Sequence, residues 1–476
     1  MKDRATPSSG ARDVRALALE ALLEAAERRV YVDALVDRRA GALDARDRRL
    51  LQELACGTVR HQNTLDHLLE PFLRTPLSRQ RAVIAWALRL GTFQIAYLSR
   101  VPSHAALDRT LEALKSAGGG RRKDVGFVNA VLRRFLATVE AHIAEPPVEK
   151  PDHALPVRDG YCLFRRAVLP ARDVGGGVAR LSLACSLPRW LVARWVSRHG
   201  LEEATHLAAA QNRPPSLTAR VTARAPAVAD VIAALAAESI DAVPGSFEGS
   251  LRLKPRSPLD RSEVLRQGWL QVQDETAMRI GAVLSPPAGA RVLDLCAAPG
   301  GKAVQLLERV GSGGRLLATD RSEKKLRILQ ENLARTGLPF EVRGVPRDPD
   351  AIDLGEDFSH VLLDAPCSNT GVLARRAEAR WRIRARVLET LAAQQGRLLE
   401  AAWRHLRPGG RLLYATCSIE PEENEDVIAA FSSRHAEAVE LETALFLPHR
   451  SGADGGFYSL LLRPSAAPAV GRPRAP

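Results

Sequence analysis

Apolar residues recur at every third or fourth position through most of residues 11–140. The spacing is clear in the segments VRALALEALLEAA, RAVIAWALRLGTFQIAYL and VGFVNAVLRRFLATV. Such spacing places the apolar side chains on one face of a helix. Ser103 and Asp108, in the segment after Pro102, lie near a further helix start. The pattern predicts an all-helical domain over residues 1–140.

The helical pattern stops after this domain. Residues 141–180 are rich in Pro and Gly, which predicts a linker with an irregular insertion. Residues 181–283 resume with a helical segment and continue with short strand-like runs, such as SLTARVTA and GSLRLK, around the helical run VADVIAALAAE. These residues are predicted to form a small α+β segment.

Strand and helix patterns alternate through residues 284–464. The apolar runs RVLDLCA, RLLATD, HVLLDAP and RLLYATCS are each followed by an amphipathic helical pattern, and GADGGFYSLLL is expected to be a closing edge strand. Such alternation predicts a parallel sheet with helices on both faces. Residues 465–476 are too rich in Pro and Ala to pack and are expected to be disordered. The predicted fold class is therefore multidomain: an all-α N-terminal domain, a small α+β middle segment and a C-terminal α/β, Rossmann-like domain.

Charge adds a candidate partner. The 476 residues carry 68 Lys and Arg against 55 Asp and Glu, a formal charge of +13. Residues 1–70 carry 12 basic and 12 acidic side chains, whereas residues 71–140 carry 12 basic and 4 acidic ones, a net charge of +8. A local basic excess is typical of a protein that binds a polyanion. Charge alone does not separate nucleic-acid binding from a generally basic surface.

The cysteines and the apolar runs indicate where the protein works. The chain has six cysteines, with neither C-x-x-C nor metal-type spacing between them: Cys56, Cys162, Cys185, Cys296, Cys367 and Cys417. With no secretory segment recognised at the start, they are expected to be reduced thiols. No apolar run of about 18 residues occurs. We therefore expect a cytoplasmic protein with no membrane span and no metal.

The loop after the first strand of the C-terminal domain has the composition of a nucleoside-cofactor site. Asp294 is followed by the residues Cys296, Ala297, Ala298, Pro299, Gly300, Gly301 and Lys302. The paired glycines let the backbone approach a ligand at a helix start, and Asp320, after the second strand, is placed to accept hydrogen bonds from ribose hydroxyls. The loop lacks both G-x-G-x-x-G and G-x-x-x-x-G-K-[ST], so S-adenosylmethionine is favoured over a dinucleotide or a triphosphate. The alternative is a tight structural turn.

Two cysteines lie just past the ends of two further strands. Cys367 follows HVLLDAP and Cys417 follows RLLYAT, so adjacent strands would bring both thiols into one cleft beside Asp364. A lone cysteine is more often a small buried hydrophobe. Thiolate attack on carbon 6 of a cytosine makes carbon 5 nucleophilic, and a carboxylate that hydrogen-bonds the amino group and ring nitrogen would favour that attack. The pattern therefore indicates carbon-5 methylation, but it does not rank the two cysteines.

Three motifs resemble those of a known family. The segments DLCAAPGGK, DAPCSNTG and YATCS-x-x-PEEN resemble the bacterial RNA (cytosine-5) methyltransferases. The resemblance implies that Cys417, in T-C-S, is the nucleophile and that Cys367, in P-C-S, helps to release the product. It also implies that residues 296–302 line the S-adenosylmethionine site, that Asp320 binds its ribose and that Asp364 lies between cofactor and base. DNA cytosine methyltransferases use the P-C cysteine alone, so two thiols favour RNA.

The N-terminal residues add a second resemblance. The segments DRRLLQELACGTVR, LRLGTFQIAYL and VPSHAALDRTLEALK are similar to the RNA-binding domain of the antitermination factor NusB. Together the two parts resemble the RsmB (Sun/Fmu) type, which methylates 16S ribosomal RNA. The resemblance implies an RNA partner, ribosomal RNA first, and we expect a monomer. The target cytosine would be displaced into the cleft, because carbon 6 is not accessible inside a base stack.

Several positions depart from the family pattern. Val345 replaces the usual acid of G-D-[AG]-R, Asn369 replaces a glycine, and Thr222 replaces the asparagine of R-V-N; Ala374 and Ala377 depart from R-R-x-P, and Asp348 comes three residues late. These departures leave two alternatives open. One is the same chemistry on transfer RNA. The other is a non-catalytic RNA-binding assembly factor that keeps the fold, although the presence of both thiols argues against it.

Overall fold

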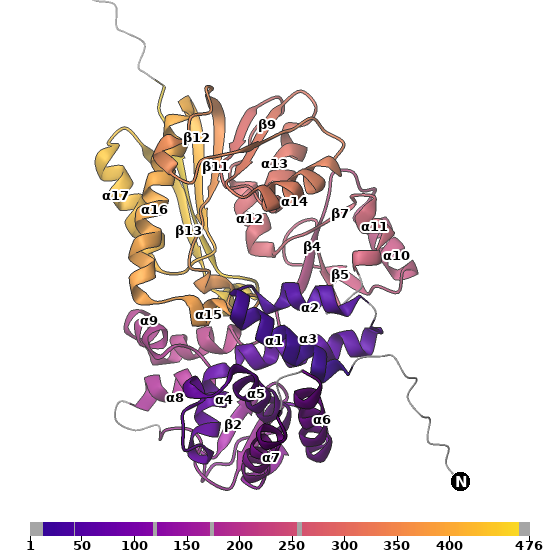
Figure 1. Cartoon of the computed structure of the whole chain (residues 1–476). Coiled ribbons are helices and arrows are strands. Elements are labelled where there is room, and N and C mark those ends of the chain that lie inside the picture. The colour runs from indigo at the N-terminus through magenta and orange to yellow at the C-terminus, as the bar shows by residue number, and fades with distance from the viewer. Residues whose placement is uncertain (1–12, 42, 118–120, 172–175, 255–258, 466–476) are drawn as a thin grey trace, which may run out of the picture. The chain divides into compact units, whose positions relative to one another are not determined.

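The computed structural model describes residues 13–41, 43–117, 121–171, 176–254 and 259–465 (Figure 1). The expected disorder of residues 465–476 falls almost wholly outside these ranges. The chain divides into two compact units, Met1–Arg213 with Arg376–Arg382, and Pro214–Arg375 with Ile383–Pro476. The first division falls inside the predicted segment 181–283. No helix among the described residues is long and apolar enough to cross a membrane.

The first unit is mainly helical, as predicted (Figure 1). Its helices are α1 (Val14–Arg28), α2 (Val32–Ala40), α3 (Ala45–Arg60), α4 (Gln62–Leu69), α5 (Ala82–Tyr97), α6 (Ser103–Ser116), α7 (Arg122–Leu136), α8 (Gly176–Ala184) and α9 (Arg189–Ala210), with 3-10 turns η1 (Glu70–Phe72) and η2 (Leu77–Arg79). Asp13 and Asp44 accept hydrogen bonds from backbone N–H groups at the starts of α1 and α3. Helix α5 is apolar on all sides and is almost completely buried, which makes it the centre of the unit.

The prediction of an irregular linker over residues 141–180 is wrong up to residue 164 and again from residue 176, where helix α8 begins. Strands β1 (Val139–Ile143), β2 (Ala154–Val157) and β3 (Gly160–Phe164) form an antiparallel sheet in the order β1-β3-β2. Leu155, Cys162 and Phe164 are buried in one cluster with Phe135 of α7. The strands are too short, and too close to Pro and Gly, to show an alternating pattern in the sequence. Residues 172–175 lie outside the described ranges.

A short segment from the predicted C-terminal domain belongs to the first unit. Residues 376–382, with helix α15 (Ala379–Arg382), contribute Ala377 and Trp381 to its helical core. The indole N–H of Trp381 donates to the carbonyl of Val59 at 2.7 Å. Arg380 is fully buried and donates to Asn212 Oδ1 at 2.8 Å, and burial lowers the pKa of Arg380 to about 9. Ala377, a departure from the family pattern, is thus a core residue.

The second unit contains a small antiparallel sheet. Its strands run in the order β5-β6-β4-β7. The elements are β4 (Leu217–Val221), α10 (Val228–Ala237), β5 (Ala242–Pro244), β6 (Ser250–Leu253), η3 (Leu259–Arg261), α11 (Glu263–Arg266) and β7 (Leu270–Val272). Val231 and Leu235 of α10 pack on Ala219 and Leu251 of the sheet. The α+β pattern predicted for these residues is confirmed. Thr222 is buried here, and its hydroxyl donates to the carbonyl of Gly268 at 2.6 Å.

The large sheet of the second unit has the order β10-β9-β8-β11-β12-β14-β13. Its strands are β8 (Arg291–Asp294), β9 (Arg315–Asp320), β10 (Glu341–Gly344), β11 (Phe358–Asp364), β12 (Leu406–Thr416), β13 (Val439–Phe446) and β14 (Gly456–Leu462). The first five in spatial order are parallel, as predicted, and β14 and β13 are antiparallel to their neighbours. The predicted edge strand β14 is in fact interior. The edge is β13, whose mixture of charged and apolar residues VELETALF gave no clear strand signal.

Helices cover both faces of this sheet (Figure 1). The covering elements are α12 (Glu275–Val283), α13 (Gly301–Val310), α14 (Glu323–Ala334), η4 (Pro349–Ala351), η5 (Thr370–Val372), α16 (Ala385–Arg404), η6 (Pro421–Glu423), α17 (Glu425–Arg434) and α18 (Pro448–Ser451). Leu307 and Leu329, from α13 and α14, are buried with Val292 and Leu316 of the strands. Successive strand residues face opposite sides, so Leu293 lies in the other cluster, with Leu399 of α16.

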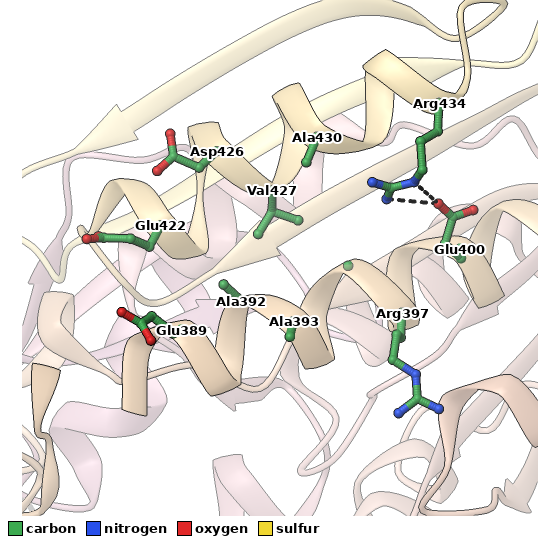
Figure 2. A pocket seen from close by; sticks show the side chains of 11 residues that line it. Glu389, Ala392, Ala393, Arg397, Glu400, Glu422, Asp426, Val427, Ala430 and Arg434 are labelled. Carbon is green, nitrogen blue, oxygen red and sulfur yellow. Dashed lines mark hydrogen bonds and ion pairs between the residues drawn. The ribbon is translucent and has the colours of Figure 1, made fainter. Parts of the chain in front are cut away.

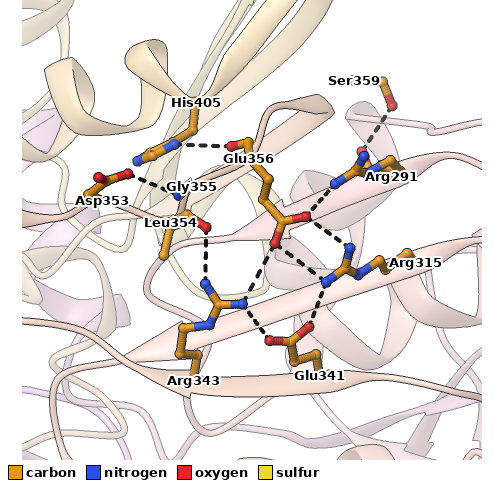
Figure 3. A network of polar contacts seen from close by, with 10 residues as sticks. All are labelled: Arg291, Arg315, Glu341, Arg343, Asp353, Leu354, Gly355, Glu356, Ser359 and His405. Atoms are coloured by element: carbon orange, nitrogen blue, oxygen red, sulfur yellow. Dashed lines mark hydrogen bonds and ion pairs between the residues drawn. The ribbon is translucent and has the colours of Figure 1, made fainter.

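The amino ends of the parallel strands are tied by ion pairs (Figure 3). Arg315, the first residue of β9, donates to Glu341 at 2.8 Å and to Glu356 at 2.9 Å, and Arg291 also pairs with Glu356. Hydrogen bonds from Arg315 and Arg343 lower the pKa of Glu341. The network joins the starts of β8, β9 and β10. It lies at the opposite ends of these strands from the predicted site residues.

Candidate active site

The predicted site residues gather at the carboxyl ends of four neighbouring strands. Asp294, Asp320 and Asp364 are the last residues of β8, β9 and β11, and Cys417 follows β12 directly. Because β9, β8, β11 and β12 are adjacent and parallel, these ends lie along one edge of the sheet. An open α/β sheet binds its ligands at this edge.

The loop 296–302 is fixed between β8 and α13. The backbone N–H of Ala297 donates to the carbonyl of Thr319 at 2.8 Å. Gly300 has a φ of 115°, and a Cβ there would lie 2.9 Å from Leu329, so the backbone itself requires glycine. A Cβ on Gly301, the first residue of α13, would only touch Gln273 at an ordinary 3.6 Å. The protein alone therefore has room for a Cβ at Gly301. A substitution there tests whether a bound ligand needs the same space.

Two carboxylates border this loop. Asp320 is 7% exposed, and its Oδ1 accepts from the backbone N–H of Ser322 at 2.9 Å. Asp294 is 1% exposed, and its carboxylate has no side-chain hydrogen-bond partner in the described ranges, although the backbone N–H of Cys296 lies beside it. Burial, together with the negative charge of Asp364, raises the pKa of Asp294 well above its ordinary value. Buried acceptors of this kind fit a ligand that carries ammonium and hydroxyl donors. Sequence reasoning used Asp294 only to mark a strand end.

Lys302 and Asp364 form an ion pair. Lys302 Nζ donates to Asp364 Oδ2 at 2.8 Å and so joins α13 to the end of β11. Burial alone would lower the pKa of Lys302, but the charge of Asp364 and the hydrogen bond between them outweigh it and raise the pKa. Lys302 was expected to line the cofactor, and that expectation stays a prediction. Its ammonium contacts the carboxylate expected to face the base.

The two thiols are in contact. Cys367 Sγ and Cys417 Sγ lie 3.0 Å apart, and both side chains are partly buried. The hydrogen bond to Cys417 and burial raise the pKa of Cys367 well above its ordinary value. In this pair Cys367 therefore holds its proton.

Asn369, which departs from the family pattern, has a physical role here. Its φ is 66°, in the left-handed region that glycine and asparagine tolerate best. Its side-chain amide donates to the carbonyl of Cys367 at 2.9 Å, and its Oδ1 lies 3.4 Å from Cys417 Sγ. Asparagine thus keeps the backbone conformation and adds contacts to both thiol-bearing residues. Sequence reasoning named the substitution but not this consequence.

Two further departures, Val345 and Asp348, follow β10. The backbone N–H of Val345 donates to the carbonyl of Asp320 at 3.3 Å. Asp348, the acid that comes three residues late, is exposed and pairs with Arg397 of α16. The side chain of Asp348 is thus engaged on the surface, and Val345 supplies no carboxylate in its place.

A groove on the surface of the second unit contains none of the predicted site residues. It has a volume of 580 Å³ and lies between α16 and α17, with Ala392, Ala393 and Val427 on its floor (Figure 2). Glu400 and Arg434 are paired at one end. The described part of the chain holds no group of three His, Cys, Asp or Glu side chains placed to bind a metal ion.

Three family models match separate parts of the chain. Residues 281–462 match the family described as 16S rRNA methyltransferase RsmB/F. Residues 12–137 match the NusB family, and residues 187–260 match the ferredoxin-like domain of RsmF/B-like methyltransferases.

Similar whole proteins are also known. The chain is 32% identical over 460 residues to the ribosomal RNA small subunit methyltransferase B of Pectobacterium carotovorum subsp. carotovorum (strain PC1). The alignment covers 95% of this chain and 99% of the relative. The protein of the same name from Yersinia pestis bv. Antiqua (strain Angola) has the same identity and coverage. The crystal structure of PH0851 covers 95% of this chain and 99% of its own, with a TM-score of 0.78 and 24% identity. NSun6 from Pyrococcus horikoshii, crystallised with SFG, covers 58% of this chain and 98% of its own, with a TM-score of 0.53 and 20% identity. These two structures support the fold.

Proposed function

The chain belongs to the RsmB/F family of 16S ribosomal RNA methyltransferases, and from this we propose that it methylates carbon 5 of a cytosine in 16S ribosomal RNA through a covalent bond from Cys417. The observation that carries the proposal is the contact between Cys367 and Cys417 at 3.0 Å, at the sheet edge where Asp364 also ends a strand. A methyltransferase that acts on oxygen or on an exocyclic nitrogen needs no thiol. Carbon-5 chemistry needs one thiol to attack carbon 6, and a second can assist release.

S-adenosylmethionine is the proposed methyl donor. When bound, it supplies an electrophilic methyl group. The backbone of residues 296–302 would line it, and Asp320 would accept hydrogen bonds from its ribose hydroxyls. The buried oxygens of Asp294, which have no side-chain partner in the described ranges, support a ligand with an ammonium group nearby.

Three side chains of the protein act on the base: Cys417, Asp364 and Cys367. The Cys417 thiolate bonds to carbon 6 of the cytosine, carbon 5 becomes double-bonded to carbon 4, and the ring nitrogen takes up the displaced electron pair together with a proton from water. Asp364, held by Lys302 at 2.8 Å, accepts hydrogen bonds from that protonated nitrogen and from the amino group. After methylation, water beside Cys367 takes the proton from carbon 5, and the electron pair of that bond forms the double bond between carbons 5 and 6. Cys417 leaves carbon 6 as a thiolate, and the ring nitrogen returns its proton to water.

The RNA partner is proposed on separate grounds. The NusB match over residues 12–137 and the net charge of +8 over residues 71–140 support contacts from the helical unit to RNA phosphates. The name shared by the curated relatives supports the small-subunit RNA as the target.

The test is methyl transfer with the purified protein. Unmodified 16S ribosomal RNA and bulk transfer RNA are incubated separately with methyl-labelled S-adenosylmethionine, and the RNA is digested to nucleosides. We expect label in 5-methylcytidine from 16S RNA and none from transfer RNA. Label in another nucleoside would overturn the carbon-5 assignment, and label from transfer RNA alone would overturn the substrate. No label with either RNA, from protein that binds S-adenosylmethionine and RNA, would support the assembly-factor alternative.

A further inference from the structure

The carboxylate of Glu423 is buried beside the two loops that carry the thiols. Glu423 ends η6, and its relative exposure is 0%. A buried carboxylate is costly unless hydrogen bonds replace its water shell. Its Oε1 accepts from the backbone N–H of Ser368 at 2.8 Å and from Gln395 Nε2 at 3.1 Å. Its Oε2 accepts from the hydroxyl of Ser418 at 2.5 Å and from the hydroxyl of Ser368.

The donors on this carboxylate are the direct neighbours of the thiols. Ser368 follows Cys367 and Ser418 follows Cys417, so one acidic group holds both loops within one residue of each sulfur. The two hydroxyls also lie 3.2 Å from each other. Both carboxylate oxygens are needed as acceptors, which an apolar side chain at this position could not provide.

The two loops depend on Glu423 to different extents. Ser368 gives both its backbone N–H and its hydroxyl to the carboxylate. Ser418 gives only its hydroxyl. Both loops have further anchors: the carbonyl of Cys367 accepts from Asn369 Nδ2 at 2.9 Å and that of Pro366 from Gln395 Nε2 at 3.0 Å, while the carbonyl of Cys417 accepts from the N–H of Gly371 at 3.0 Å and that of Ser418 from Asn424 Nδ2 at 3.1 Å. The Cys367 loop differs in losing two hydrogen bonds with the carboxylate, and its anchor Gln395 also donates to Glu423. Loss of the carboxylate should therefore release the Cys367 loop first and leave Cys417 in place.

We propose that Glu423 is a positioning residue that keeps Cys367 against Cys417, and that its contribution to turnover lies in product release rather than in attack. The inference about release rests on the proposed function, whereas the inference about thiol geometry stands without it. Attack on carbon 6 uses only Cys417. Release needs Cys367 within reach of carbon 5, next to the sulfur that leaves.

Two measurements on Glu423→Gln test this proposal. The amide keeps the shape but replaces an acceptor oxygen with a donor, so the four hydrogen bonds cannot all persist. In single turnover with labelled 16S ribosomal RNA and S-adenosylmethionine, we expect the covalent protein–RNA species to decay about tenfold to a hundredfold more slowly than in the wild type. Its rate of formation and the KM for RNA should stay within about twofold, well under the tenfold that corresponds to 1.4 kcal/mol.

The second measurement needs no methylation. With diamide as a two-electron oxidant, the two thiols form a disulfide and diamide is reduced to its hydrazine, and mass spectrometry of peptides gives the rate. We expect fast coupling of Cys367 to Cys417 in the wild type and slower coupling in Glu423→Gln, because the sulfurs are no longer held in contact. Asp426→Asn, which removes an exposed acidic charge three residues away, is the matched control and should behave as the wild type in both assays.

Each result decides something. Folded Glu423→Gln with wild-type disulfide formation and wild-type decay of the adduct would overturn the proposal. Loss of adduct formation in a folded variant would show that Glu423 supports attack, which also overturns it. If Glu423→Gln does not fold, Ser368→Ala carries the test with the same expected direction. If coupling slows in Glu423→Gln but the wild type never forms an RNA adduct, the positioning role stands and the proposed function fails.

Discussion

Replacing Asp294 with asparagine should stabilise the cofactor-free protein and weaken its affinity for the cofactor. Asp294 is 1% exposed, and its carboxylate has no side-chain hydrogen-bond partner in the described ranges. Burial and the charge of Asp364 raise its pKa well above the ordinary 3.8. A raised pKa in the folded state means that folding disfavours the charged form. Asp294 therefore lowers the free energy of unfolding, and it does so increasingly as the pH rises above the pKa that Asp294 has in the unfolded chain.

The cost of charging the carboxyl sets the magnitude of this effect. Asparagine at this position is as buried and as polar as a protonated carboxyl, so the cost of burying a polar group is the same in both proteins. A carboxyl that stays protonated in the folded protein loses about 1.4 kcal/mol for each pH unit above its unfolded pKa, which amounts to at most about 4 kcal/mol at pH 7. We therefore expect Asp294→Asn to raise the free energy of unfolding by up to about 4 kcal/mol at pH 7. Near pH 4 the difference should almost vanish.

The assay is denaturant unfolding of both proteins between pH 4 and pH 8, with and without S-adenosylmethionine. Calorimetry should show weaker binding of S-adenosylmethionine to the variant, because an amide neutralises no ammonium group. The control, Asp426→Asn, changes an exposed carboxylate and should shift stability by less than about 0.5 kcal/mol. A variant that is less stable than the wild type at pH 7, or equally stabilised at pH 4 and pH 7, would refute the reasoning.

Two further predictions concern the cofactor loop and the basic stretch. Gly301→Ala should weaken binding of S-adenosylmethionine by calorimetry while leaving the melting temperature near that of the wild type, because the nearest atom to the added Cβ lies at an ordinary 3.6 Å. Unchanged affinity would remove this loop from the site. Replacing the exposed Arg122, Lys123 and Arg133 with glutamine should weaken RNA binding and lower the slope of log affinity against log salt by about 2, or roughly 0.7–0.9 for each phosphate that is no longer neutralised. An unchanged salt slope would move the phosphate-binding surface elsewhere.

The features that could be predicted from the sequence are those set by the order of residues within one strand or one loop. Alternation of strands and helices gave the parallel part of the sheet, and the strand ends then placed Asp320, Asp364 and both cysteines at one edge. Strand β13 and the small sheet β1-β3-β2 were missed because their residues are of mixed polarity and show no alternating pattern. These strands form because they pair with neighbours, which the local sequence does not reveal.

The sequence did not predict contacts that join separate loops. Glu423 lies in the recognised PEEN segment, but its bonds to Ser368 depend on the adjacency of β11 and β12. The ion pair of Lys302 with Asp364 joins a helix start to a strand end in the same way. A signal for the first contact was present, since each thiol is followed by serine, a residue able to donate to a shared acceptor.

The measurement that tests the central claim most directly is the trapping of a covalent protein–RNA species in two single variants. Cys417→Ser should form neither product nor adduct, because the hydroxyl does not attack carbon 6. Cys367→Ser should accumulate an adduct that survives denaturing electrophoresis and requires S-adenosylmethionine. An adduct in the Cys417 variant and none in the Cys367 variant would reverse the two roles, and normal turnover in both variants would contradict the covalent mechanism itself.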